Sequence, residues 1–166
     1  MIIKPNSQNL GNAGEYFISY KLSLHDYVTS ITLGRNEGFD ILAVSPAGEM
    51  FKIQVKTKWE KNKKFWILSK KAEKQVEPNL YYAFIEIIDE AEQEPNFWII
   101  PSAIVAELCT EEHKGYLEAG KKDNTIRIFG IMGQQKVSKY FPTKYLTVIH
   151  ELKNKVQFIK EKEGRF

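Results

Sequence analysis

The stretch that decides the fold begins with Gly38-Phe39-Asp40 and ends, after a turn, with Gln54-Val55-Lys56. Between them, Pro46-Ala47-Gly48 is typical of a hairpin turn, which would lay the strand that opens at Asp40 beside the second strand. Side chains in a strand alternate, so the glutamine and the lysine of the second strand share one face and the valine faces the core. A carboxylate, an amide oxygen and an ammonium group are therefore expected to meet at one end of this hairpin.

Around this hairpin, the sequence alternates between strand and helix patterns and contains no internal repeat. Apolar periodicity and capping residues predict helices over 7–24, 70–76, 103–117 and 144–162. Ser102 is the expected N-cap of the third of these helices. Runs rich in β-branched and aromatic residues predict strands over 27–33, 39–44, 50–58, 65–68, 80–88, 97–100 and 125–129. The predicted class is α/β (α+β), with one domain over residues 1–166.

Length and composition limit the kinds of protein that this chain can be. The chain has 166 residues, the usual size of one domain, and 43% of them are hydrophobic. A single cysteine, Cys109, excludes a disulfide framework and a zinc site built from several cysteines. No apolar run is long enough to span a membrane, and the first residues lack the pattern of a signal peptide. We expect a cytoplasmic protein that makes no membrane contact.

The charges are segregated along the chain. Residues 52–74 hold nine lysines against two glutamates, whereas residues 86–118 hold nine acidic residues against one lysine. A basic side of this kind can bind nucleic acid, although lysine-rich stretches are also common on ordinary solvated faces. The expected nucleic-acid contacts are one tryptophan, as a stacking platform, and four lysines of the basic stretch, namely Trp59, Lys58, Lys61, Lys63 and Lys64.

The polar groups of the hairpin have the chemistry of a divalent-cation site. Mg²⁺ and Mn²⁺ prefer oxygen ligands, and Asp40, Gln54 and a backbone carbonyl, assigned to Val55, would supply three. Lys56 would hold the attacking water or stabilise negative charge on a phosphate. The alternatives are that Asp40 only accepts hydrogen bonds from loop amides and that Lys56 is an ordinary surface lysine.

These motifs, together with Gly14-Glu15 in the first helix, resemble the PD-(D/E)XK nuclease superfamily. The chain is especially similar to a small bacterial branch of that superfamily, through Phe39–Ala43, Ile53–Thr57, Phe65–Ser69, Leu80–Phe84 and Phe97–Ser102. The resemblance covers about residues 8–118 and leaves 119–166 as a C-terminal extension. It implies a restriction-endonuclease-like core in which helices flank a central mixed sheet.

The resemblance also implies roles for individual residues. Asp40 would be the metal-binding acid, Lys56 the catalytic lysine, and Glu15 the acid on the first helix that reaches the metal. Gln54 stands where most of the superfamily has Glu or Asp, and in this the chain resembles Mrr-type restriction enzymes. The missing negative charge predicts weaker metal binding. An acid early in a helix is also favoured by the helix dipole alone, which is the alternative for Glu15.

Two functions from different classes follow from this reading. The first is a metal-dependent endonuclease that hydrolyses phosphodiester bonds, with DNA as the expected substrate. The second is a catalytically inactive module with the nuclease fold that binds nucleic acid or a protein partner. A homodimer formed through the aromatic strands is compatible with both functions.

Overall fold

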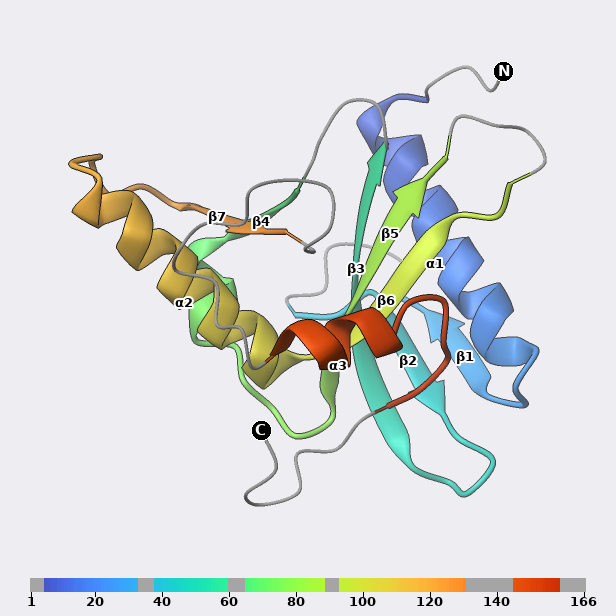
Figure 1. The fold of residues 1–166 in the computed structure, drawn as a ribbon. Coiled ribbons are helices and arrows are strands. Elements are labelled where there is room, and N and C mark those ends of the chain that lie inside the picture. The colour runs from blue at the N-terminus through green and yellow to red at the C-terminus, as the bar shows by residue number, and fades with distance from the viewer. Residues whose placement is uncertain (1–4, 33–37, 60–64, 89–92, 131–144, 159–166) are drawn as a thin grey trace.

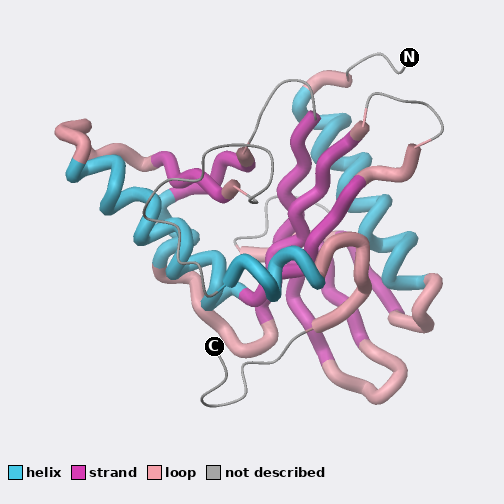
Figure 2. Tube along the Cα trace, viewed as in Figure 1, coloured by secondary structure: helices cyan, strands magenta, loops and turns pink. Residues whose placement is uncertain are grey.

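The chain forms a central sheet with helices on both sides (Figures 1 and 2). A computed structural model describes residues 5–32, 38–59, 65–88, 93–130 and 145–158. The sheet has the order β1-β2-β3-β5-β6, with β1 at Val28–Ile31, β2 at Ile41–Val44, β3 at Met50–Trp59, β5 at Leu80–Ile87 and β6 at Asn96–Pro101. β3 and β5 are parallel and the other neighbours are antiparallel, so the predicted α+β class with a mixed central sheet is confirmed.

The hairpin between β2 and β3 forms as its sequence predicts. The Ser45 N–H donates to the Glu49 carbonyl at 2.8 Å, and Gly48 takes a φ of +82°, a conformation that suits glycine. The register pairs Val44 with Met50 and Ile41 with Ile53. β2 therefore covers only the first four residues of the ten-residue β3, and the rest of β3 extends past it.

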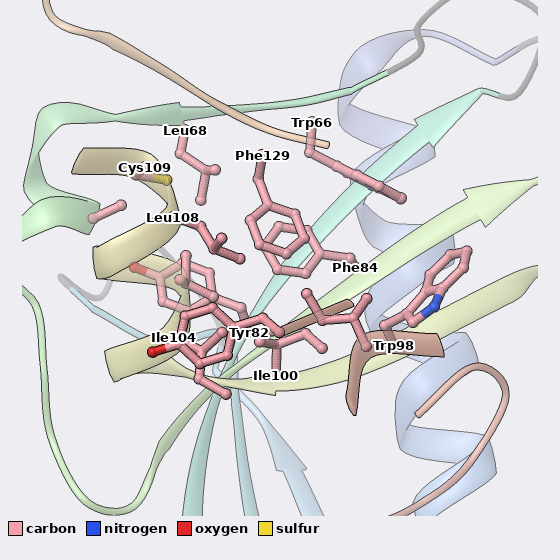
Figure 3. Close-up of a cluster of buried hydrophobic side chains, with 14 of the residues drawn as sticks. Trp66, Leu68, Tyr82, Phe84, Trp98, Ile100, Ile104, Leu108, Cys109 and Phe129 are labelled. Atoms are coloured by element: carbon pink, nitrogen blue, oxygen red, sulfur yellow. The ribbon is translucent and has the colours of Figure 1, made fainter. Parts of the chain in front are cut away.

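Each face of the sheet carries its own apolar cluster. On one face, α1 (Ser7–Ser23) packs Ile18 and Leu22 against the side chains of Ile53, Val55, Ala83 and Ile85. On the other face, α2 (Ser102–Glu118) packs against Tyr82, Phe84, Trp98 and Ile100 (Figure 3). A second, two-stranded sheet covers this second cluster, formed by β4 (Trp66–Ser69) and β7 (Ile126–Phe129).

Two predicted helix features are corrected by the structure. Ser102 is not the N-cap of α2 but its first residue, and Pro101 occupies the cap position. The residues predicted as helix 70–76 form only a 3₁₀ turn, η2, at Lys70–Glu73.

The C-terminal helix is much shorter than predicted. α3 spans Leu146–Glu151, and the described residues after Glu151 are not helical. Asn154 takes a φ of +57°, its N–H donates to the Phe97 carbonyl at 2.8 Å, and its Oδ1 accepts from the Phe97 N–H at 2.9 Å. The chain therefore leaves the helix after Glu151, and Asn154 forms hydrogen bonds with β6. Residues 144 and 159–162 of the prediction lie outside the described residues.

Among the helices of the described ranges, none combines the length and the apolar character that crossing a membrane requires.

Candidate active site

Asp40 lies directly before β2 and is bonded to β3 by both its backbone and its side chain. Its N–H donates to the Ile53 carbonyl at 2.8 Å, and its Oδ2 accepts from the Val55 N–H at 2.7 Å. The Asp40 carbonyl accepts from the Thr32 N–H at 2.9 Å. The carboxylate is therefore fixed at the start of β2, where β3 extends beyond its pairing with β2 and, among the described strands, only β5 continues beside it.

The same edge of β3 presents a backbone oxygen. In a strand, the N–H and C=O groups of one residue point to the same side. Because the Val55 N–H points at Asp40, the Val55 carbonyl oxygen also faces the edge beside that carboxylate. The edge thus combines a carboxylate with a peptide oxygen, both of them ligands that a hard cation accepts.

Gln54 and Lys56 share the opposite face of β3 from Val55, as the alternation predicts. Gln54 lies opposite Tyr82 of β5 and Lys56 lies opposite Phe84, and both side chains are half-buried. Burial lowers the pKa of the Lys56 ammonium, and the negative charges of Asp40 and Glu15 oppose this shift. Lys56 is therefore within electrostatic reach of both carboxylates.

Glu15 on α1 completes the group of charges. Its pKa is raised from the usual 4.5, first by burial and second by the negative charge of Asp40, while the Lys56 ammonium acts in the opposite direction. A bound cation would relieve the repulsion that the Asp40 charge exerts on the Glu15 carboxylate.

Close packing of α1 on β3 brings Glu15 to this place. A Cβ atom built on Gly14 would lie 1.9 Å from Thr57 Oγ1, so only glycine allows the helix to approach the strand this closely. Thr57 Oγ1 is buried at this contact and has no hydrogen-bond partner among the described residues. The glycine therefore sets the spacing between the helix that carries Glu15 and the strand that carries Lys56.

The donor set fits a divalent cation that prefers oxygen. Asp40, the Val55 carbonyl and Glu15 carry oxygen atoms that a cation can bind. The Gln54 amide carries another, on the face of β3 opposite the Val55 side chain. Within the described part of the chain, no group of three or more His, Cys, Asp or Glu side chains has metal-binding geometry. Any cation site here therefore depends on amide and peptide oxygens in addition to the acids.

Two of the predicted nucleic-acid contacts are buried in the structure. Trp59 is 5% exposed and packs into the protein, so the expectation of a stacking platform is corrected. Lys58 is 3% exposed, and its Nζ lies 2.5 Å from Glu86 on β5. Its charge is neutralised in this buried ion pair, so the expectation that it contacts nucleic acid is corrected as well. The other three predicted lysines, Lys61, Lys63 and Lys64, lie outside the described residues.

Sequence reasoning missed the residues that hold the loop before Asp40. Gln75 Nε2 donates to the Gly38 carbonyl at 3.1 Å, and Thr32 Oγ1 donates to the Asp40 carbonyl at 3.1 Å. Neither residue belongs to a recognisable motif, and both reach the loop only through tertiary packing. No signal in the sequence identifies them.

Comparison with known proteins gives one family. The family described as PD-(D/E)XK endonuclease matches residues 5–117, a span that includes Glu15, Asp40, Gln54 and Lys56. The curated protein sequences contain no significant match. Among solved structures, the chain is similar to a bacterial homing endonuclease, I-Ssp6803I, with 10% sequence identity, a TM-score of 0.48, and coverage of 90% of this chain and 95% of that chain.

Proposed function

The chain belongs to the PD-(D/E)XK endonuclease family, and we propose that it is a metal-dependent nuclease that hydrolyses phosphodiester bonds in DNA. The observation that carries the proposal is the hydrogen bond from the Val55 N–H to Asp40 Oδ2. This bond fixes a carboxylate beside a strand edge that also presents a peptide oxygen. Lys56 and Glu15 are electrostatically coupled to that carboxylate.

The residues that would hold the cation, Mg²⁺ or Mn²⁺, are Asp40, Glu15, Gln54 and the Val55 carbonyl. When bound, such a cation polarises a phosphoryl oxygen and lowers the pKa of coordinated water. Asp40 keeps one carboxylate oxygen on the Val55 N–H, which orients the other toward a ligand. Glu15 must be deprotonated to contribute, and its raised pKa brings this step closer to neutral pH.

Lys56 is proposed to act on the phosphate and the attacking water. Because its pKa is lowered toward neutral pH, the Lys56 ammonium gives up its proton more easily than an ordinary lysine does. While protonated, it donates to a non-bridging phosphate oxygen or to water and stabilises the negative charge that develops there. Partial burial makes this charge more effective than it would be in open water.

An exposed cation beside the site supports nucleic acid as the substrate. Lys74 is exposed and lies directly before Gln75, whose side chain contacts the Asp40 loop. Its ammonium is therefore placed to contact a phosphate that flanks the scissile bond. The deoxyribose backbone is proposed on the basis of the endonuclease family.

Cleavage of supercoiled, linear and branched DNA in Mg²⁺ and in Mn²⁺, with an EDTA control, tests the proposal. The decisive variant is Asp40→Asn, whose amide oxygen can still accept from the Val55 N–H while the charge is lost. We expect its cleavage rate to fall by about 100-fold or more. Cleavage by this variant at the wild-type rate would remove Asp40 from the site.

Gln54 favours one second candidate, a module that binds DNA without cutting it. A neutral amide at the position of an acid lowers the negative charge available to a cation. Retention of labelled DNA without cleavage in either metal would support this candidate over the nuclease.

A further inference from the structure

The loop that carries Asp40 is held from outside the hairpin by residues 74–79, the segment between η2 and β5. Gln75 Nε2 donates to the Gly38 carbonyl at 3.1 Å. Gly38 has a φ of +121°, and a Cβ built on it would lie 2.8 Å from the same Nε2 atom. The Gln75 amide therefore occupies the space that a side chain at position 38 would fill.

Segment 74–79 is itself firmly attached to the protein. Ser102, which is 1% exposed at the start of α2, accepts from the Glu77 N–H at 3.1 Å and donates to the Glu77 carbonyl at 3.0 Å. One hydroxyl thus satisfies both backbone groups of Glu77. A buried hydroxyl with two such bonds gives the segment a fixed anchor only two residues after Gln75.

A second, indirect connection runs from this segment through Lys52 of β3 to the Asp40 loop. Glu77 Oε2 lies 2.7 Å from Lys52 Nζ, and that ammonium lies 6.0 Å from the centroid of the Phe39 ring. Lys52 belongs to the basic stretch of the sequence, yet its charge is engaged in holding the segment to β3. Segment 74–79 therefore contacts Gly38 directly and reaches Phe39 only through Lys52 of β3.

We propose that Gln75 is a positioning residue for Asp40, acting through the Gly38 carbonyl; this inference rests on the proposed function. Asp40 itself is held by the Ile53 carbonyl and the Val55 N–H of β3 and by the N–H of Thr32, the residue after β1. The bond from Gln75 fixes the loop on the opposite side, two residues earlier. Without it, the backbone at Gly38 is free to move and the Asp40 carboxylate loses its fixed direction toward the strand edge.

The test is amide hydrogen exchange at Val55, because its N–H reports directly on the Asp40 side chain. Gln75→Met keeps the volume and removes the donor. We expect exchange at Val55 to accelerate by about 5-fold, the effect of one ordinary hydrogen bond. The amide of Leu42, within the β1–β2 ladder, should be unaffected. Val76→Ala, a neighbouring exposed position that is 52% accessible, serves as the matched control and should leave both amides unchanged.

A second variant approaches the same contact from the other side. Gly38→Ala places a methyl group against the Gln75 amide and strains the backbone, so it should also accelerate exchange at Val55. Unchanged exchange at Val55 in Gln75→Met, with the Gly38→Ala effect intact, would overturn the role of Gln75. Equal acceleration at Val55 and Leu42 in Gln75→Met would overturn it as well, because that result indicates general destabilisation.

Cleavage kinetics separate positioning from substrate contact. Gln75→Met should reduce kcat by roughly 10-fold and leave the DNA dissociation constant unchanged. Weaker DNA binding with unaltered exchange at Val55 would make Gln75 a nucleic-acid contact and contradict the proposal. The exchange measurement needs neither DNA nor metal, so its outcome stands whether or not the protein cleaves DNA.

Discussion

Lys56 and Lys58 lie two residues apart on the same face of β3, yet their surroundings are opposite. Lys58 is 3% exposed, its Nζ lies 2.5 Å from Glu86 Oε1, and the same atom lies 4.3 Å from the centroid of the Trp66 ring. Lys56 is only partly buried, and the charges that act on it come from Asp40 and Glu15.

The residue that β5 places opposite each lysine accounts for the difference. Glu86 lies opposite Lys58, so this ammonium is neutralised within the protein and serves the fold. Phe84 lies opposite Lys56 and offers no charge, so that ammonium remains under the influence of the two site carboxylates. Two identical side chains on one strand therefore have different roles because a parallel neighbour supplies an acid to one of them.

The largest effect is expected from breaking the structural pair. Lys58→Met leaves the Glu86 carboxylate buried without its cation and should reduce the free energy of unfolding by about 3–5 kcal/mol. Urea denaturation followed by circular dichroism measures it. The double variant Lys58→Met/Glu86→Gln removes the stranded charge and should regain part of the loss. Wild-type stability in Lys58→Met would show that the two lysines do not differ in the way described.

Lys56→Met should have the reverse profile, with cleavage lost and stability kept. Without its ammonium, the cleavage rate is expected to fall by about 100-fold. Because burial lowers the pKa of Lys56, the charged form is disfavoured in the folded state, and folding gains stability as pH rises between the lowered and the ordinary pKa. At neutral pH the variant should therefore be at least as stable as the wild type.

Thermal melting and plasmid cleavage, with Lys114→Met at an exposed position of α2 as control, test this profile. A large drop in melting temperature without loss of cleavage would assign Lys56 to the fold rather than to the site.

The pH dependence of metal binding tests whether Glu15 belongs to the charged group around Lys56. Because the pKa of Glu15 is raised, a larger fraction of its carboxyl groups is protonated at pH values above 4.5 than in an ordinary glutamate. These groups must release their protons when a cation binds. Mg²⁺ affinity should therefore fall as pH decreases toward that range, and calorimetry in two buffers of different ionisation enthalpy should detect proton release. Glu15→Gln should abolish the release. Equal proton release in both proteins would place Glu15 away from the cation.

The smallest effect is expected at Gln54, two residues before Lys56 on the same face. Gln54→Glu replaces a neutral amide with a carboxylate and should tighten Mg²⁺ binding by roughly 10-fold. Isothermal titration calorimetry measures the change, with Asp40→Asn as the opposite control. Unchanged or weaker affinity would exclude Gln54 from the metal ligands and leave Asp40 and Lys56 as candidates.

The hairpin could be predicted from sequence because all its signals are local. The turn at Pro46–Gly48 and the alternation of β3 fix the register, and the register brings Asp40 to Val55. The burial of Lys58 has no local signal, because it depends on the parallel pairing of β3 with β5. A lysine on the polar face of a strand appears identical in sequence whether or not an acid lies opposite.

The C-terminal helix shows a different limit of sequence reasoning. Its apolar stripe is genuine, and Ile149 and Leu152 pack into the cluster shown in Figure 3. Val156, which continues the same spacing, packs instead with Phe158 into the cluster on the other face of the sheet. No single helix can reach both faces, so tertiary packing overrides the helical period after Glu151.

The contact between Gly14 and Thr57 has a consequence for engineering. A designer who transplants Asp40 and Lys56 onto another hairpin would recover one carboxylate and the lysine, but not Glu15, which depends on the approach of a helix to the strand. The transferable unit is therefore the hairpin together with α1, joined at a position where even one methyl group would have to lie 1.9 Å from a hydroxyl oxygen. A library that randomises position 14 should return glycine from functional selection, whereas the exposed position 13 of the same helix should accept many residues.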